Sequence, residues 1–295
     1  MTRKFISKRP HYEYLKKRWT GRHRAIQNKV WEKHKSSLDW LTKSIPVRQL
    51  AVSSLGSLML LAQPVGYLSQ PPLLLPNQHI TAQIDENQKV ARQLFGIPKD
   101  AKSLTNDEEK EVEDILSKNF NLRVSAFLEG IRLNRSYGII GGEQHLYRFP
   151  GDNLYKHAQN FTEWAMYGSS GIAPALGAWG YFTPTESEFS EKDKMREKYY
   201  LAVQTFLAPG FAENVDKYRD FFKLRKMLVV NAKTGQAVVA VVGDAGPAEW
   251  TGKHLGGSPE VMHYLGLASG PRQGPVFYFF IDDPQDQVPL GPKII

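Results

Sequence analysis

Two acidic residues in glycine-rich surroundings, Asp244 and Glu143, are this sequence's candidates for acid–base chemistry. Asp244 ends the apolar run "AVVAVVGD", after which Gly246 permits a close approach of the chain and Pro247 fixes the next dihedral angle. The carboxyl group is therefore expected on a stiff turn at the end of a strand. Held there, it could donate and accept protons, or it could only cap the backbone amides of its own turn. The residues around Asp244 leave both roles open.

The stretch "GGEQHLYRFPGD" concentrates polar side chains around Glu143. Glu143 and His145 would share one face of a strand and could jointly hold a ligand or a proton. Arg148 is a candidate for positioning a substrate. The alternative is a polar loop in which Arg148 and Asp152 pair with each other, and the sequence favours neither interpretation.

No metal site and no cofactor are expected from the sequence. The eight histidines show neither an H-x-H nor an H-x-x-x-H spacing, although folding could still bring His145 and His254 together. The absence of cysteine excludes disulfides, thiolate metal sites and a cysteine nucleophile. No glycine-rich stretch has the spacing of a nucleotide-binding motif.

Aromatic side chains can stack on sugar rings, and Trp250 is the best placed of them. It lies six residues after Asp244 in a glycine-rich loop, where an indole is difficult to bury. Trp250 is therefore the preferred candidate for contact with a carbohydrate. His145 and Arg148 are the further substrate-binding candidates.

The elements that must position these residues are short strands in the C-terminal half. The predicted strands occupy residues 178–182, 199–207, 226–232, 236–244 and 276–282. The glycine-containing connection at 233–235 predicts a hairpin. The run "AVVAVV" is apolar on both faces, which is typical of a small closed barrel whose outside is covered. The fold class is therefore mainly β with added helices (α+β).

The basic character of the chain belongs to its N-terminus. Residues 1–46 carry thirteen Lys or Arg against three acids, and no charged residue occurs from 49 to 84. This order predicts a cytoplasmic leader followed by an apolar membrane anchor at 47–68. The apolar part is short for a spanning helix, so a cleaved export signal and a buried core helix remain alternatives. Nucleic-acid binding by the leader is not expected, because the uncharged segment follows it directly.

The remaining boundaries follow from composition. A proline-rich linker is expected at 69–104 and a helical segment at 105–136, which opens with a Ser/Thr-x-x-Glu capping box. The barrel domain is expected at 137–295, with an insertion at about 152–222. The C-terminal domain would then lie outside the cell membrane, or be secreted if the apolar segment is cleaved.

A strand pair that ends in Asp-x-Gly-Pro, followed by a helix that opens with Ser and closes with Leu-Gly, resembles the double-psi β-barrel of the rare lipoprotein A and expansin-like cell-wall proteins. The matching positions are Val230, Asn231, Gly235, Val239, Val241, Asp244, Gly246, Pro247, Ser258, Leu265 and Gly266. The match covers Leu224 to Phe280 and, more loosely, Tyr137 to Asp152. Two positions depart from the family pattern: Gly243 replaces an Asn, and Gly256 or Gly257 replaces an acid that expansin-like relatives use.

The resemblance implies a protein that binds peptidoglycan or another cell-envelope glycan and that, in some members, is a lytic transglycosylase. In that activity Asp244 would be the proton donor and acceptor, and Glu143, the counterpart of a family acid, would assist it. The missing acid at 256 or 257 leaves a non-catalytic glycan-binding or scaffold module on the same fold as the alternative.

Overall fold

The computed structural model describes residues 78–97 and 103–295. Its helices are α2 (Gln78–Leu94), α3 (Asn106–Phe120), α4 (Phe161–Tyr167), α5 (Glu191–Lys198), α6 (Val215–Phe222) and α7 (Pro259–Tyr264). Its strands are β1 (Val124–Ser125), β2 (Phe127–Leu128), β3 (Ile131–Arg132), β4 (Tyr137–Gly142), β5 (Tyr200–Val203), β6 (Lys226–Asn231), β7 (Ala237–Ala245), β8 (Leu255–Gly257), β9 (Gln273–Ile281) and β10 (Gly291–Lys293). The leader at 1–46 and the apolar segment at 47–68 lie outside the described residues. Within the ranges described, no helix is both long and apolar enough to cross a membrane.

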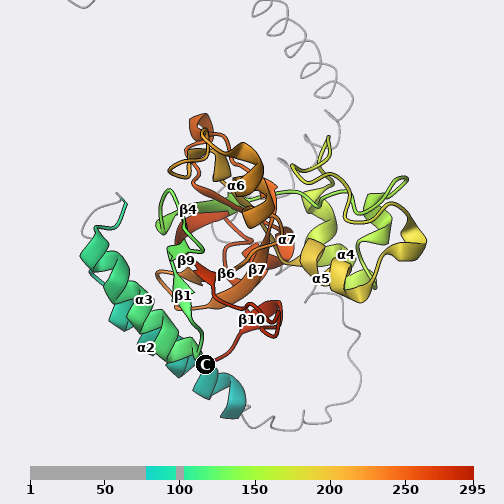
Figure 1. Ribbon diagram of the computed structural model, residues 1–295. Coiled ribbons are helices and arrows are strands. Elements are labelled where there is room, and N and C mark those ends of the chain that lie inside the picture. The colour runs from blue at the N-terminus through green and yellow to red at the C-terminus, as the bar shows by residue number, and fades with distance from the viewer. Residues whose placement is uncertain (1–77, 98–102) are drawn as a thin grey trace, which may run out of the picture. The chain divides into compact units, whose positions relative to one another are not determined.

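Six strands close into a β-barrel in the order β9, β4, β8, β5, β7, β6, because β6 pairs with both β7 and β9 (Figure 1). Two of the pairings are parallel, β4 with β8 and β5 with β7, and the others around the barrel are antiparallel. Strands β1 and β10 extend the sheet at β9 and β7. The expectation of a closed β-barrel with added helices is confirmed.

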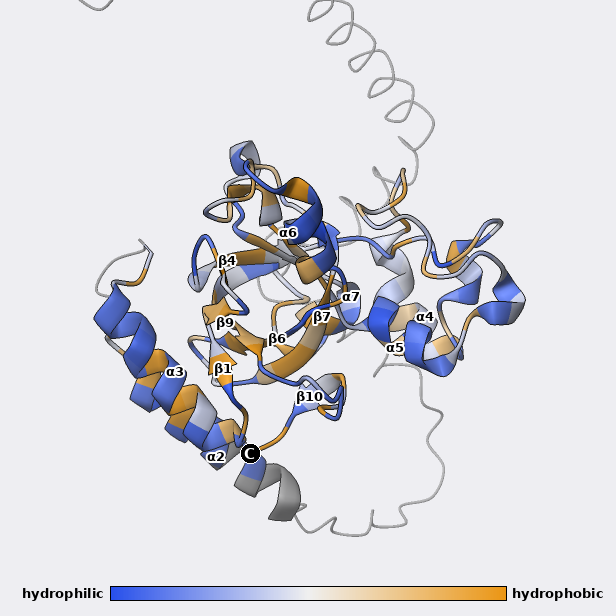
Figure 2. Cartoon of the chain, viewed as in Figure 1, coloured by the Kyte–Doolittle hydropathy of each residue, from blue (hydrophilic) through white to orange (hydrophobic). Residues whose placement is uncertain are grey.

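The barrel wall is apolar on both faces because the inner face packs in the barrel core and the outer face packs against helices. Val238, Ala240 and Val242 of β7 point into the barrel core, whereas Val239 packs outside with residues of α2 and α3. The two helices lie along one side of the barrel, and their apolar residues face it (Figure 2). The covered outside that the valine run predicts is thus a helical layer.

Two helices in the N-terminal part of the described chain form this layer. α3 begins with the predicted capping box, in which the Thr105 side chain accepts from the amide of Glu108 and the Glu108 carboxylate accepts from the amide of Thr105. The prediction of a linker at 69–104 is wrong for residues 78–94, which form α2. That helix forms because Val90 and Leu94 bury against α3 and the barrel wall, which composition alone does not reveal.

Three further boundaries differ from the expectation. The second half of the segment 105–136 is extended rather than helical, because β1 pairs with the edge of β9 and β2 pairs with β3. The insertion at 152–222 contains β5, a barrel strand, so the inserted structure consists of two pieces on either side of it. The stretch 178–182 is a turn and not a strand, with Gly180 at a φ of +76°.

The hairpin between β6 and β7 confirms the predicted connection at 233–235 and also positions α2. Gly235 has a φ of +74°, and a Cβ there would lie 2.0 Å from the backbone oxygen of Asn87 in α2. Glycine is therefore required both by the left-handed conformation and by the contact with the helix.

We expect Gly235→Ala to destabilise the protein by more than the roughly 1–2 kcal/mol of a left-handed alanine, because α2 must also move away from the hairpin. The matched control is Gly151→Ala, which has a φ of +81° but open space around the added methyl group. Thermal unfolding of both variants measures the difference. Equal losses of stability would show that α2 does not press on this turn.

Candidate active site

A β-bulge sets the direction of the Asp244 side chain. In the parallel pairing of β5 with β7, Leu201 lies opposite Val242 but Ala202 lies opposite Asp244, so Gly243 is an extra residue on β7. Strict alternation would point Asp244 into the barrel with Val242. The bulge instead turns it to the outer face, together with Ala202.

Backbone amides hold the Asp244 carboxyl group in place. Its Oδ1 accepts from the amide of Ala178 at 2.6 Å and from the amide of Ala245 at 2.8 Å. The turn that carries Ala178 is fixed in turn, because the Trp179 indole donates to the backbone oxygen of Val242. Burial raises the pKa of Asp244 above its usual value, although the two amides oppose the rise. Asp244 thus caps its own turn, as the simpler interpretation predicts, and remains a weakened acid.

Glu143 directly follows β4 and lies over the outer face of β8. Its amide donates to Gly257, and a Cβ at Gly256 would lie 2.5 Å from the Glu143 Cγ. The Lys253 Nζ lies 3.3 Å from its carboxylate. Burial raises the pKa of Glu143 and repulsion from Asp244 adds to the rise, while Lys253 opposes it.

The structure brings Asp244 and Glu143 together across small residues. Asp244 is paired with Ala202, Ala202 with Gly256, and the Glu143 side chain lies over Gly256. Tyr200 lies beside Gly243, where an added Cβ would be 2.6 Å from its own Cβ. Burial raises the pKa of Tyr200 well above the usual value, and the negative charges of Glu143, Glu197 and Asp244 add to the rise. The acids therefore share one outer face of the barrel although about a hundred residues separate them in sequence.

A polar cavity of about 210 Å³ adjoins this face at Lys253. Other residues around it are Asn134, Arg135, Gln204, Glu249 and His254. Trp250 lies in the adjacent 3-10 turn Glu249–Thr251, and its side chain is 88% exposed. Amide, guanidinium and carboxylate groups beside an exposed indole are the kinds of group that bind carbohydrates.

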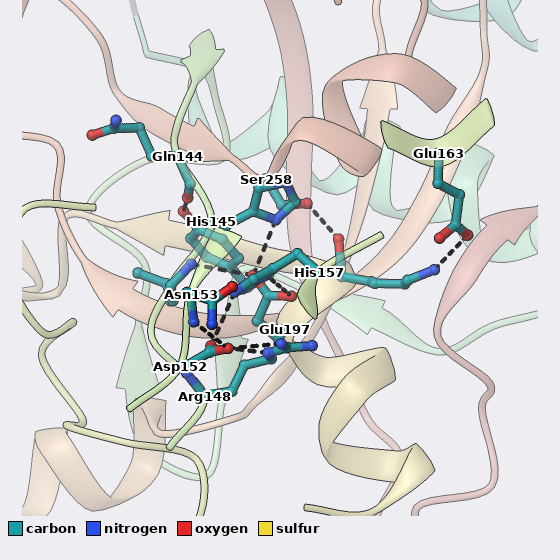
Figure 3. A network of polar contacts seen from close by, with 12 residues as sticks. Gln144, His145, Arg148, Asp152, Asn153, His157, Glu163, Glu197 and Ser258 are labelled. Carbon is teal, nitrogen blue, oxygen red and sulfur yellow. Dashed lines mark hydrogen bonds and ion pairs between the residues drawn. The ribbon is translucent and has the colours of Figure 1, made fainter. Parts of the chain in front are cut away.

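Arg148 and Asp152 form a buried pair, which is the alternative that the sequence left open. The Arg148 guanidinium donates twice to the Asp152 carboxylate, at 2.9 and 2.7 Å, and both side chains are buried (Figure 3). Asp152 also contacts His157 Nε2 at 2.9 Å. These bonds hold the pKa of Asp152 well below its usual range despite its burial. Arg148 therefore has a structural role: it holds the buried carboxylate of Asp152 in place.

His145 lies in the same interior network. Its Nδ1 is 3.3 Å from Glu197 Oε1, and the Nδ1 of His157 is 3.3 Å from Glu197 Oε2. Burial would lower the pKa of His157, but its contacts with Asp152 and Glu197 raise it to about 9. The structure thus joins His145 to His157, whereas His254 accepts from the amide of Ile139. His145 and Arg148 are both buried, so neither side chain is exposed for the contact with a polymer that the sequence had suggested.

Sequence reasoning missed Lys253, Tyr200 and the amide of Ala178 as neighbours of the two acids. The chain matches no known family model, and no curated protein shows significant similarity to it. Two half-buried carboxyl groups with raised pKa values can exchange protons with a bound molecule, and one cation beside them can hold a negative charge on Glu143.

Proposed function

We propose that this protein binds the glycan strands of peptidoglycan and cleaves them as a lytic transglycosylase. The observation that carries the proposal is the bulge at Gly243. It places Asp244 on the same outer face as Glu143, with a raised pKa and a carboxyl oxygen fixed by two amides. A single fixed carboxyl group that can lose and regain a proton is what this reaction requires.

In the proposed reaction Asp244 donates its proton to the glycosidic oxygen that leaves N-acetylmuramic acid. The C1–O bond breaks, and positive charge develops at the anomeric carbon. Glu143, held as a carboxylate by Lys253, stabilises this charge. Asp244 then takes the proton of the C6 hydroxyl, whose oxygen bonds to C1 and closes a 1,6-anhydro ring. No water is consumed, and Asp244 ends the cycle protonated, as it began.

The topology supports a double-psi arrangement of the barrel. The parallel pairs β4 with β8 and β5 with β7 place the ends of separated strands beside each other, so that Asp244 and Glu143 can meet. The two departures from the family pattern also have physical explanations. A side chain at Gly243 would meet Tyr200 at 2.6 Å, and one at Gly256 would displace Glu143.

The substrate would lie over the acids and extend toward Trp250 and the polar cavity beside Lys253. Access to peptidoglycan requires that the barrel lie outside the cytoplasm. A basic leader at 1–46 followed by an anchor or signal at 47–68 would place it there, as part of the proposal.

The test incubates the purified full chain with intact peptidoglycan and determines the masses of the released fragments. The proposal expects soluble fragments with anhydro ends. If nothing is released while the chain still sediments with the insoluble polymer, the catalytic proposal is wrong and the protein is a glycan-binding module. That second candidate is favoured by one observation: the exposed Trp250 lies beside the polar cavity, and these groups could bind a glycan without help from either acid.

Trp250→Ala is expected to weaken the binding free energy for peptidoglycan by about 0.5–1.5 kcal/mol, which is a few-fold to about tenfold loss of affinity. Sedimentation with peptidoglycan measures this loss, and thermal stability is expected to stay unchanged. The matched control is Phe161→Ala, because Phe161 is also highly exposed, at 84%, but lies on α4. Equal loss of binding in both variants would mean that exposed aromatic residues contribute unspecifically.

Lys253→Met is expected to lower the cleavage rate several-fold at the optimum pH and to move the acid limb of the pH–rate profile upward. Lys253 lowers the pKa of Glu143, so without it Glu143 ionises only at higher pH. The profile of kcat/KM against pH measures this shift. An unchanged acid limb with the alkaline limb moved upward would instead identify Glu143 as the proton donor.

A further inference from the structure

Three buried side chains outside the proposed active site converge on one point. Ligand atoms of His145, His157 and Glu197 all lie within 4.8 Å of one another, and the side chains are only 2, 2 and 3% exposed. They come from the loop after β4, the loop after the 3-10 turn Leu154–Lys156, and the end of α5 (Figure 3).

Hydrogen bonding fixes which nitrogen of His157 carries a proton. Its Nε2 faces Asp152 at 2.9 Å, and Asp152 is an ionised acceptor because Arg148 donates to it twice. Nε2 therefore carries hydrogen, and in a neutral ring Nδ1 presents a lone pair. That Nδ1 is buried, lies 3.3 Å from Glu197 Oε2, and has no hydrogen-bond partner among the described residues. A lone pair that faces a carboxylate is repelled by it unless a second ring proton or a metal cation lies between the two atoms.

The spacing of the atoms is compatible with a small tetrahedral metal ion. Both imidazole Nδ1 atoms lie 3.3 Å from a Glu197 oxygen, which is long for a charge-assisted hydrogen bond of about 2.7–2.9 Å. Bonds of about 2.0–2.1 Å to a tetrahedral zinc ion place neighbouring ligand atoms about 3.3–3.4 Å apart. We propose that His145, His157 and Glu197 bind a divalent transition-metal ion of the zinc type.

The surroundings fit such an ion. Asp152 is the outer carboxylate that orients a metal-binding histidine through its second nitrogen. Glu260, a further buried acid with an Oε2 that lacks a partner in the described part of the chain, is repelled by Glu197. A dication reduces that repulsion. Trp164 and Tyr167 border both imidazoles in a crevice that has no room for a water molecule, so the site is shielded from solvent.

The ion has a structural role in this proposal. His145 lies three residues after β4 and Glu197 three residues before β5, and His157 belongs to the inserted segment between those strands. Binding all three ties the first inserted piece to the barrel. That piece also carries Ala178, whose amide holds Asp244.

The test uses the full chain stripped of metal with a chelator, to which ZnCl₂ or CoCl₂ is added. We expect one ion retained per chain after gel filtration, a higher Tm with ZnCl₂, and visible absorption bands of a four-coordinate site with CoCl₂. If the stripped chain retains neither ion and its Tm does not change, the proposal is wrong and His157 is an imidazolium held between two carboxylates.

Variants locate the ion. Glu197→Gln is expected to abolish retention, and Asp152→Asn to weaken it by about 10- to 100-fold. The control is His263→Asn, an exposed histidine on α7 outside the cluster, which is expected to bind as the unaltered chain does. Retention by a folded Glu197→Gln chain would contradict the assignment. The metal titration of the unaltered chain decides the matter if a variant fails to fold.

Discussion

Asp244→Asn is expected to reduce the rate of glycan cleavage by a factor of about 10²–10⁴, the contribution of a positioned general acid. The asparagine oxygen can still accept from the amides of Ala178 and Ala245, so the turn and the bulge are retained. Only the exchangeable proton is lost. We therefore expect binding to peptidoglycan and thermal stability to stay close to those of the unaltered chain.

The measurement for this variant is the initial rate of fragment release at the optimum pH. Asp216→Asn is the matched control, because Asp216 is an exposed aspartate on α6. We expect the control to cleave at the unaltered rate. A rate for Asp244→Asn within twofold of the control would remove Asp244 from the reaction and leave it as a turn residue.

Gly256→Ala is expected to reduce cleavage by a factor on the order of 10², because small displacements of a catalytic group have effects of that size. The added methyl group would lie 2.5 Å from the Cγ of Glu143, so the carboxylate must move away from its position beside Lys253. The alanine is compatible with the strand, so we expect the fold to persist. This substitution changes the position of Glu143 without changing its chemistry.

A double-mutant cycle tests whether Gly256→Ala acts by displacing the Glu143 side chain. In a Glu143→Ala background the obstructing side chain is absent, and Gly256→Ala is expected to have little further effect on the cleavage rate. Additive losses from the two substitutions would show that the alanine acts through the barrel strand itself. In that case the absence of a side chain at Gly256 would not be what positions Glu143.

Several parts of the fold could be predicted from local sequence. The capping box at Thr105, the hairpin at Gly235 and the two-sided apolar run of β7 each have short-range signals, and the structure confirms them. The strand predicted at 199–207 is present as β5, Tyr200–Val203, but the sequence placed it in the insertion and did not reveal its pairing with β7 and β8. α2 depends on tertiary packing, which the linker-like composition before it conceals.

The site was predictable only in part, for a physical reason. Sequence and resemblance named Asp244 and Glu143, but alternation along β7 would point Asp244 inward, and only the pairing with β5 reveals the bulge. Lys253 has no local signal that links it to Glu143, from which 110 positions separate it. The histidine and glutamate cluster was missed for the same reason, since His145 and Glu197 are 52 positions apart.

The fate of solvent oxygen during cleavage tests most directly whether Asp244 activates the C6 hydroxyl of the glycan. Peptidoglycan is digested by the full chain in water enriched in heavy oxygen, and the new ends are examined by mass spectrometry. Because Asp244 is proposed to activate the C6 hydroxyl, we expect anhydro ends that are one water lighter than hydrolysis products and carry no label. Reducing ends that carry heavy oxygen would contradict it, because water would then be the nucleophile.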